Sequence, residues 1–468
     1  MLVLAVTLFA IANLPWELDD FDQAKQAFTS FEMVEQGHWF YQHTPNWWVA
    51  TKPPLVGWIS AGIFEVPRSW ELAWRLPSFL STIALLALVL RAAAIYGPVA
   101  ALTAACAFSF NLFALRLASL VRTDMPLALV IFAVGWLIWE KIRSQTPWTK
   151  RDRIVLFLLL SAGMLIKGPI VYAFLLPGLV AFEWRRRKTK TAGSAWSGWV
   201  PWLLSFLVFL LWAAGGILFV PEFTEHVVLR EFAGRFSEAV HRSQPIFFYF
   251  PHLLHRFAPW SLLLLALGFL ALRKNKESST ESRPIRPETF WLVVWSLSGL
   301  LVMSFVPSKR IDRIFPIVPP LCLLLAVLVG QVRERQRALV DRCCALAIVL
   351  AGVFMSAYTV RKVGTATREE RDAFAVFGRA VTKETVAHGW RYGVVGGEEE
   401  GMLLYVRRTE FLEPSEAAAD WNAGKLDALV VPDDEIEGLL PQLHGEPKKL
   451  LSSGRAGRYG KRYFLLAR

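Results

Sequence analysis

The sequence predicts a polytopic α-helical membrane protein with a small soluble α/β domain at its C-terminal end. Three observations support this prediction. The 468 residues are 54% hydrophobic and only 19% charged, whereas a soluble globular domain carries about 25% charged residues. Eleven apolar runs follow one another, many of them near the length of a membrane-spanning helix. After Tyr358 the composition changes to that of a mixed soluble domain.

The apolar runs predict about 11 transmembrane helices. They lie at 1–14, 76–95, 98–117, 125–140, 154–168, 169–184, 198–220, 259–272, 289–306, 314–330 and 341–360. The first run is short and lacks the basic residues of a signal peptide, while Ala10-Ile11-Ala12 resembles a cleavage site. We expect it to be a retained first span.

The basic residues predict the orientation in the membrane. The net charge is +12, but the lysines and arginines lie in short clusters between apolar runs, which is typical of cytoplasmic loops and not of a nucleic-acid-binding surface. The richest clusters lie near 141–153, 185–190, 273–286 and 333–342. The alternate loops, including two long ones at 15–75 and 221–258, then face outward.

The last hundred residues predict the soluble domain. Helical stretches at 368–383, 414–422 and 433–440 alternate with strand-like stretches at 392–395, 428–431 and 462–466. We therefore divide the chain into a membrane domain, 1–360, and a small α/β domain, 361–468. The odd number of expected spans places the second domain on the outer side.

The first outer loop contains the candidate general base. Asp19, Asp20 and Asp22 follow the first apolar run, and Lys52 precedes Pro53-Pro54, which stiffen an extended backbone. Mutual repulsion raises the pKa of at least one of three nearby acids, as a base requires. The alternative is a solvated acid cluster that caps a helix containing Lys25. That helix has the spacing of an amphipathic helix in the membrane interface.

Cations from separate outer loops predict an anionic ligand. Several fixed positive charges together suit a phosphate whose negative charge develops during a reaction. Each cation alone is better explained as a lipid headgroup contact or a snorkelling side chain. The candidates are Lys52, Arg235, Lys309, Arg310 and Arg313. Further site candidates on the same side are Arg122, Asp124, His241 and Tyr249. The aromatic run that contains Tyr249 suits the wall of a sugar or isoprenoid site, or an interfacial helix.

No cofactor and no metal site are expected. The four cysteines lie in or beside apolar runs without metal-ligand spacing. His38, His43, His226, His252 and His255 show no spacing with an acid that is typical of a metal site.

In order and sidedness these motifs resemble those of the GT-C membrane glycosyltransferases. Asp22 lies about thirty residues before Lys52-Pro53-Pro54-Leu55. The later motifs are Arg122-Thr123-Asp124, Lys167-Gly168-Pro169, Arg235-Phe236, His241 before Pro245, Pro259-Trp260, and Lys309 before Phe315-Pro316. The resemblance covers about residues 15–325. It points to the bacterial lipid A aminoarabinose transferases and the dolichyl-phosphate-mannose protein mannosyltransferases.

The resemblance implies the GT-C fold and an enzyme of the bacterial inner membrane. Such an enzyme moves a sugar, with inversion, from a polyprenyl-phosphate donor to a lipid, glycan or protein acceptor on the periplasmic side. It implies that Asp22 is the catalytic base and that Lys52 and Arg235 face the donor phosphate. In the aminoarabinose transferases an acid precedes this lysine and a histidine precedes the Arg-Phe pair, and both positions are metal-associated. Here they are Thr51 and Phe232.

Two other classes of protein remain as alternatives. A transporter or flippase for an anionic lipid-linked sugar would use the same cations, but it predicts charges inside the spans and two related halves. The sequence shows almost no charge in the middle of an apolar run and no internal repeat. A membrane scaffold that presents the C-terminal domain leaves the cations of the outer loops without a role.

Overall fold

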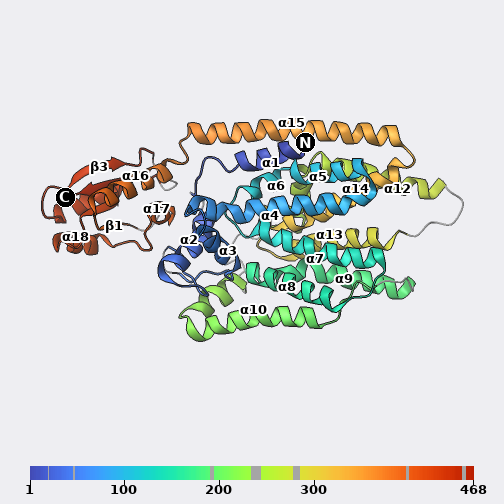
Figure 1. Ribbon diagram of the computed structural model, residues 1–468, viewed down its shortest axis with the longest axis horizontal. Coiled ribbons are helices and arrows are strands. Elements are labelled where there is room, and N and C mark those ends of the chain that lie inside the picture. Colours follow the sequence, from blue (N-terminus) through green and yellow to red (C-terminus); the bar gives the residue numbers. More distant parts are fainter. Residues whose placement is uncertain are drawn as a thin grey trace. The chain divides into compact units, whose positions relative to one another are not determined.

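The computed structural model describes residues 1–18, 21–45, 48–189, 194–232, 244–277, 285–396, 400–455 and 460–468 (Figure 1). The chain folds into two compact units. Unit 1 contains residues 1–12, 51–56 and 75–360, and unit 2 contains residues 13–50, 57–74 and 361–468. Most of the predicted first outer loop therefore belongs to the same unit as the C-terminal residues.

Unit 1 is helical in its described parts, and every predicted apolar run forms helix. Its α-helices are α1 (Leu2–Ile11), α4 (Trp70–Ala93, from Arg75 on), α5 (Pro98–Ser109), α6 (Leu112–Ala118), α7 (Asp124–Ser144), α8 (Lys150–Lys167), α9 (Ile170–Thr189), α10 (Val200–Phe219), α11 (Tyr249–Arg256), α12 (Trp260–Glu277), α13 (Pro287–Phe305), α14 (Val318–Arg333) and most of α15 (Arg337–Arg368). The short 3-10 and π segments are η1 (Ala94–Tyr96), η2 (Thr224–Phe232), η4 (Ile246–Phe248) and η5 (Ile311–Ile317).

Within the described ranges, six helices are long and apolar enough to span a membrane, and two bent pairs bring the number to eight. The bent pairs are α5 with α6 and η4–α11 with α12. The expected number of about 11 is not reached because α1 has only 10 residues, and α8 and α9 have strongly basic ends. Lys150 and Arg151 begin α8, and Arg186–Lys188 lie in the last turn of α9. The prediction of a polytopic helical membrane protein is confirmed.

Glycines allow α9 and α13 to pack closely. A Cβ atom at Gly299 of α13 would lie 2.5 Å from the Phe174 ring of α9, and one at Gly178 of α9 would lie 3.1 Å from the Trp295 backbone. Small residues at such contacts let helix backbones approach in membranes, where dispersion forces drive association. The long helices α7, α8, α9 and α13 run side by side as a result (Figure 1).

Unit 2 contains helices and one mixed sheet. Its helices are α2 (Phe21–Gln36), α3 (Leu55–Phe64, from Gly57 on), α16 (Ala373–His388), α17 (Glu400–Tyr405), α18 (Pro414–Asn422), α19 (Asp433–Leu439) and the short η6 (Leu440–Gln442). The strands are β1 (Tyr392–Val394), β2 (Ala428–Pro432), β3 (Lys448–Ser452) and β4 (Tyr463–Ala467), in the order β1-β2-β4-β3. β1 and β2 are parallel, and β4 is antiparallel to both neighbours.

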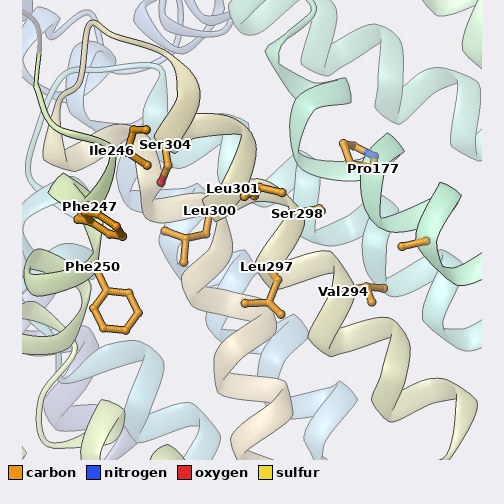
Figure 2. Close-up of a pocket in the computed structure, with 11 residues that line it drawn as sticks. Pro177, Ile246, Phe247, Phe250, Val294, Leu297, Ser298, Leu300, Leu301 and Ser304 are labelled. Carbon is orange, nitrogen blue, oxygen red and sulfur yellow. The ribbon is translucent and has the colours of Figure 1, made fainter.

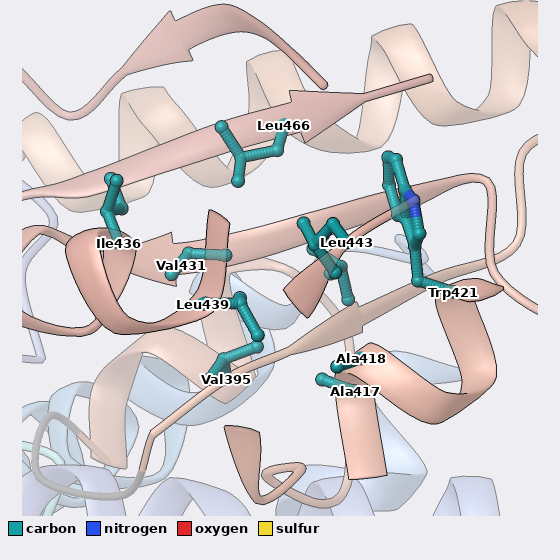
Figure 3. Packing of buried hydrophobic residues seen from close by; sticks show 10 residues of the cluster. Val395, Ala417, Ala418, Trp421, Val431, Ile436, Leu439, Leu443 and Leu466 are labelled. Atoms are coloured by element: carbon teal, nitrogen blue, oxygen red, sulfur yellow. The ribbon is translucent and has the colours of Figure 1, made fainter. Parts of the chain in front are cut away.

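A hydrophobic cluster of the small domain packs against this sheet. Trp421 of α18 and Leu439 of α19 pack with Val431 of β2 and Leu466 of β4 (Figure 3). The predicted helices and three of the strands are present. The unpredicted strand, β3, lies at the sheet edge with mostly exposed residues, so it lacks the apolar alternation that reveals a half-buried strand.

The first outer loop packs against the C-terminal residues inside unit 2. The apolar face of α2, including Phe28 and Phe31, is buried, and α2 contacts α17. The amphipathic pattern of this helix therefore reflects packing against protein. The Leu18 N–H donates a hydrogen bond to the Tyr405 hydroxyl (2.5 Å), and Arg407 pairs with Glu71 (3.3 Å).

Candidate active site

Lys52 and Asp124 belong to one charged region of unit 1. Lys52 is half-buried. Its positive charge attracts the negative charge of the Asp124 carboxylate. Asp124 begins α7, where the positive end of the helix dipole favours an anion. Lys167, the last residue of α8, donates a hydrogen bond to Asp124 (2.5 Å). This hydrogen bond joins the Lys167-Gly168-Pro169 turn to the N-terminal end of α7.

A second buried ion pair joins the α6–α7 turn to η5. Arg122 lies 3.3 Å from the Asp312 carboxylate, and the side chains are 7% and 8% exposed. Arg116 of α6 lies 3.8 Å from the same oxygen of Asp312. A buried charge is costly unless it is paired, so Asp312 fixes Arg122 in place.

Three more cations lie in η5 or in the segment just before it. Lys309 is largely buried and donates a hydrogen bond to the Gln244 carbonyl (2.9 Å). Burial lowers the pKa of Lys309, because desolvation disfavours its charged form. Arg313 donates to the Ser308 carbonyl (2.7 Å), and Arg310 is half-buried.

We call these side chains the cation cluster: Lys52, Arg116, Arg122, Lys167, Lys309, Arg310 and Arg313. They come from segments adjoining α3, α6, α7, α8 and η5, and the carboxylates of Asp124 and Asp312 pair with three of them. Several guanidinium and ammonium groups held near one another can bind a phosphate.

The other predicted site residues are not members of the cation cluster. Asp22 and Lys25 lie on α2 in unit 2. Tyr249 begins α11, which contacts η5, and is fully buried. Asp19, Asp20, Arg235 and His241 lie outside the described residues.

Two groups of interacting side chains, one in each unit, were not predicted from the sequence. Asp312 holds Arg122 across 190 positions of the chain, and a lone acid within a basic segment is the only signal that could have drawn attention to it. Glu32, His38 and His43 come together in unit 2, although the sequence spacing of these histidines indicates no metal site.

An apolar pocket of about 510 Å³ opens between α9, α13 and the η4–α11 segment. Phe247 and Phe250 lie on one side, Pro177 lies opposite, and leucines of α13 stand between them (Figure 2). The polar groups in its wall are few, namely Ser298 and Ser304. Such a pocket suits a hydrocarbon chain.

Comparison with known proteins identifies the fold. The structure of ArnT from Cupriavidus metallidurans bound to undecaprenyl phosphate superposes with a TM-score of 0.74, at 16% identity, over 99% of this chain and 97% of that one. The chain has the GT-C fold. The predicted resemblance to the GT-C membrane glycosyltransferases is thereby confirmed.

Sequence comparisons agree with this GT-C assignment. Residues 51–212 match the family described as dolichyl-phosphate-mannose-protein mannosyltransferase. Undecaprenyl phosphate-alpha-4-amino-4-deoxy-L-arabinose arabinosyl transferase 1 of Sodalis glossinidius is 27% identical over 307 residues, 52% of each chain. The corresponding transferase of Yersinia pestis is 31% identical over 159 residues, which cover 31% of this chain and 27% of that one. The chain thus spans about half or less of the length of these relatives.

Proposed function

We propose that the protein is an inverting glycosyltransferase that uses a polyprenyl-phosphate sugar donor. The cation cluster is the observation that carries this proposal. The leaving group of such a donor is a lipid phosphate, whose charge grows as the glycosidic bond breaks. Cations fixed by buried partners, as Asp312 fixes Arg122 (3.3 Å), stabilise that charge without reorganising during the reaction.

In this proposal Lys52, Arg122, Lys309 and Arg313 bind or face the donor phosphate, and Asp22 acts as the base. Arg235 and Arg310 face the same phosphate, and Lys25, Asp124, Tyr249 and His241 are further site candidates. The Asp22 carboxylate takes the proton of the acceptor hydroxyl, the hydroxyl oxygen attacks the anomeric carbon, and the carbon–oxygen bond to the phosphate breaks on the opposite face. The apolar pocket beside Phe247 and Phe250 accommodates part of an isoprenoid chain.

The proposal extends to the setting of the reaction. Because the curated relatives are bacterial enzymes named for undecaprenyl-phosphate donors, we place this chain in the bacterial inner membrane with its site on the periplasmic side. The basic loops between the apolar runs support this orientation. The acceptor is a lipid, a glycan or a protein.

The experiment uses purified protein in liposomes with a panel of radiolabelled polyprenyl-phosphate sugars. We expect one donor to be consumed, with sugar appearing on an acceptor in added envelope extract. Lys52→Met should raise the KM for the donor, whereas Lys425→Met, in an exposed ion pair with Asp420 of the small domain, should leave it unchanged. Movement of intact labelled lipid across the bilayer without transfer would contradict the proposal and favour a flippase.

A further inference from the structure

Three potential metal ligands converge in unit 2. The Nδ1 atoms of His38 and His43 lie 2.8 Å and 2.7 Å from the same oxygen, Oε1, of Glu32. The two imidazole rings meet edge to face with centroids 5.6 Å apart. Glu32 is fully buried, and both histidines are partly exposed. One carboxylate oxygen and two ring nitrogens thus lie within 4.8 Å of one another.

The backbone holds this arrangement in place. α2 ends at Gln36, and Gly37, with φ +76°, turns the chain back so that His38 returns toward Glu32. The His43 N–H donates a hydrogen bond to Oε2 of Glu32 (2.5 Å), which leaves Oε1 for the imidazoles. Gln42 is buried and its amide donates to the His38 carbonyl (2.9 Å). Outer contacts of this kind orient the ligands of metal sites.

A cation beside Glu32 would stabilise the buried charge of its carboxylate. Its side chain is only 1% exposed, and a buried carboxylate is costly unless a positive charge lies beside it. The two imidazoles supply a positive charge only when they are protonated. A divalent cation bound by Oε1 and both nitrogens neutralises the carboxylate directly.

We propose that Glu32, His38 and His43 bind a divalent transition metal of the zinc type. Imidazole nitrogen with a carboxylate oxygen suits zinc and its neighbours, whereas calcium and magnesium prefer oxygen ligands alone. Ligands about 2.1 Å from a tetrahedral zinc ion lie about 3.4 Å apart. Small rotations of the two partly exposed imidazoles therefore convert the hydrogen-bonded cluster into a coordination site, with solvent as the remaining ligand.

The metal would cross-link two segments of the first outer loop. It joins the last turns of α2 to the segment 38–50, which an isolated β-bridge between His43 and Val49 already closes. Thr51 and Lys52 follow this segment directly in the chain. The inference concerns binding alone and does not depend on the proposed glycosyl transfer.

The test measures zinc bound by the full-length protein, purified in detergent without a polyhistidine tag. The wild type is compared with His38→Asn and His43→Asn, because asparagine retains a hydrogen-bond donor for Glu32 but is a poor zinc ligand. His388→Ala is the matched control, since His388 is an exposed histidine of unit 2 that stacks on Trp390.

We expect one zinc ion per wild-type chain and binding weakened at least about tenfold in both asparagine variants, as loss of a ligand costs at least what loss of an outer contact does. His388→Ala should match the wild type. Substituted Co²⁺ should give a visible absorption band in the wild type that is absent from the two asparagine variants. Equal zinc content in all four proteins, or no zinc in the wild type after incubation with the metal, would overturn the inference.

Discussion

Asp312 is the residue on which the arrangement of the cation cluster depends most. It lies 3.3 Å from Arg122 and 3.8 Å from Arg116, and both it and Arg122 are nearly fully buried. Removing one partner of a buried ion pair leaves an uncompensated charge, at a cost of about 3–5 kcal/mol. Asp312 is therefore a positioning residue for the cations that the proposal assigns to the donor phosphate.

We predict that Asp312→Asn lowers the thermal unfolding midpoint of the detergent-purified protein by several degrees. The control is Glu140→Gln, which breaks the exposed Arg143–Glu140 pair (2.7 Å); exposed pairs contribute at most about 1 kcal/mol. Thermal melts of the three proteins compare the two sites. Equal shifts for the two variants would show that Asp312 has no special role.

The lowered pKa of Lys309 predicts that donor binding weakens at alkaline pH. Burial lowers the pKa of this lysine, so its charge is present below the lowered pKa and is lost, as pH rises, earlier than that of an ordinary lysine. The KM for the donor should rise on the alkaline side. Lys309→Arg should move that rise to higher pH, because arginine keeps its charge. A KM profile that is the same in both proteins would remove Lys309 from the phosphate site.

At the scale of elements, the packing of α16 on α17 sustains the small domain. A Cβ atom at Gly378 of α16 would lie 2.4 Å from the Tyr405 carbonyl oxygen, whereas one at Gly438 of α19 meets nothing within 4 Å. Both glycines lie in helices. This makes them a matched pair for measuring the contribution of close packing.

Gly378→Ala should destabilise unit 2 by about 1–3 kcal/mol, the usual cost of overpacking. Gly438→Ala should leave stability unchanged or raise it by up to about 1 kcal/mol, because alanine favours a helix. Limited proteolysis of the full-length protein measures the difference. Faster cleavage of the Gly438→Ala variant than of the Gly378→Ala variant would contradict the packing described here.

The helices of this molecule were easier to predict than its contacts. Each apolar run forms helix, because an unpaired backbone is excluded from the hydrocarbon region. The sequence predicts about 11 spans, and the described residues contain six to eight candidate spans. The difference arises partly because the length of an apolar run does not reveal the charged ends of α8 and α9. The sequence does not predict the edge strand β3, because its mostly exposed residues show no alternation of apolar and polar side chains.

Contacts between distant residues explain the rest of the difference. Lys167 and Asp124 belong to separate motifs of the sequence, and they pair at 2.5 Å. The partners Arg122 and Asp312, and the Glu32–His38–His43 group, depend on how turns fold back. No local spacing encodes those approaches. The resemblance to GT-C glycosyltransferases supplied roles for Asp22 and Lys52 that the structure alone does not assign.

Glycosyl transfer by Asp22 is the central claim of this account. The most direct test measures sugar transfer from the labelled polyprenyl-phosphate donor by wild type, Asp22→Asn and Glu35→Gln, the last being an exposed acid on the same helix α2. Loss of a catalytic base costs about 10²-fold or more. We predict that loss for Asp22→Asn, with a normal thermal melt, and near wild-type transfer for Glu35→Gln. Full activity of Asp22→Asn would contradict the assignment of the base.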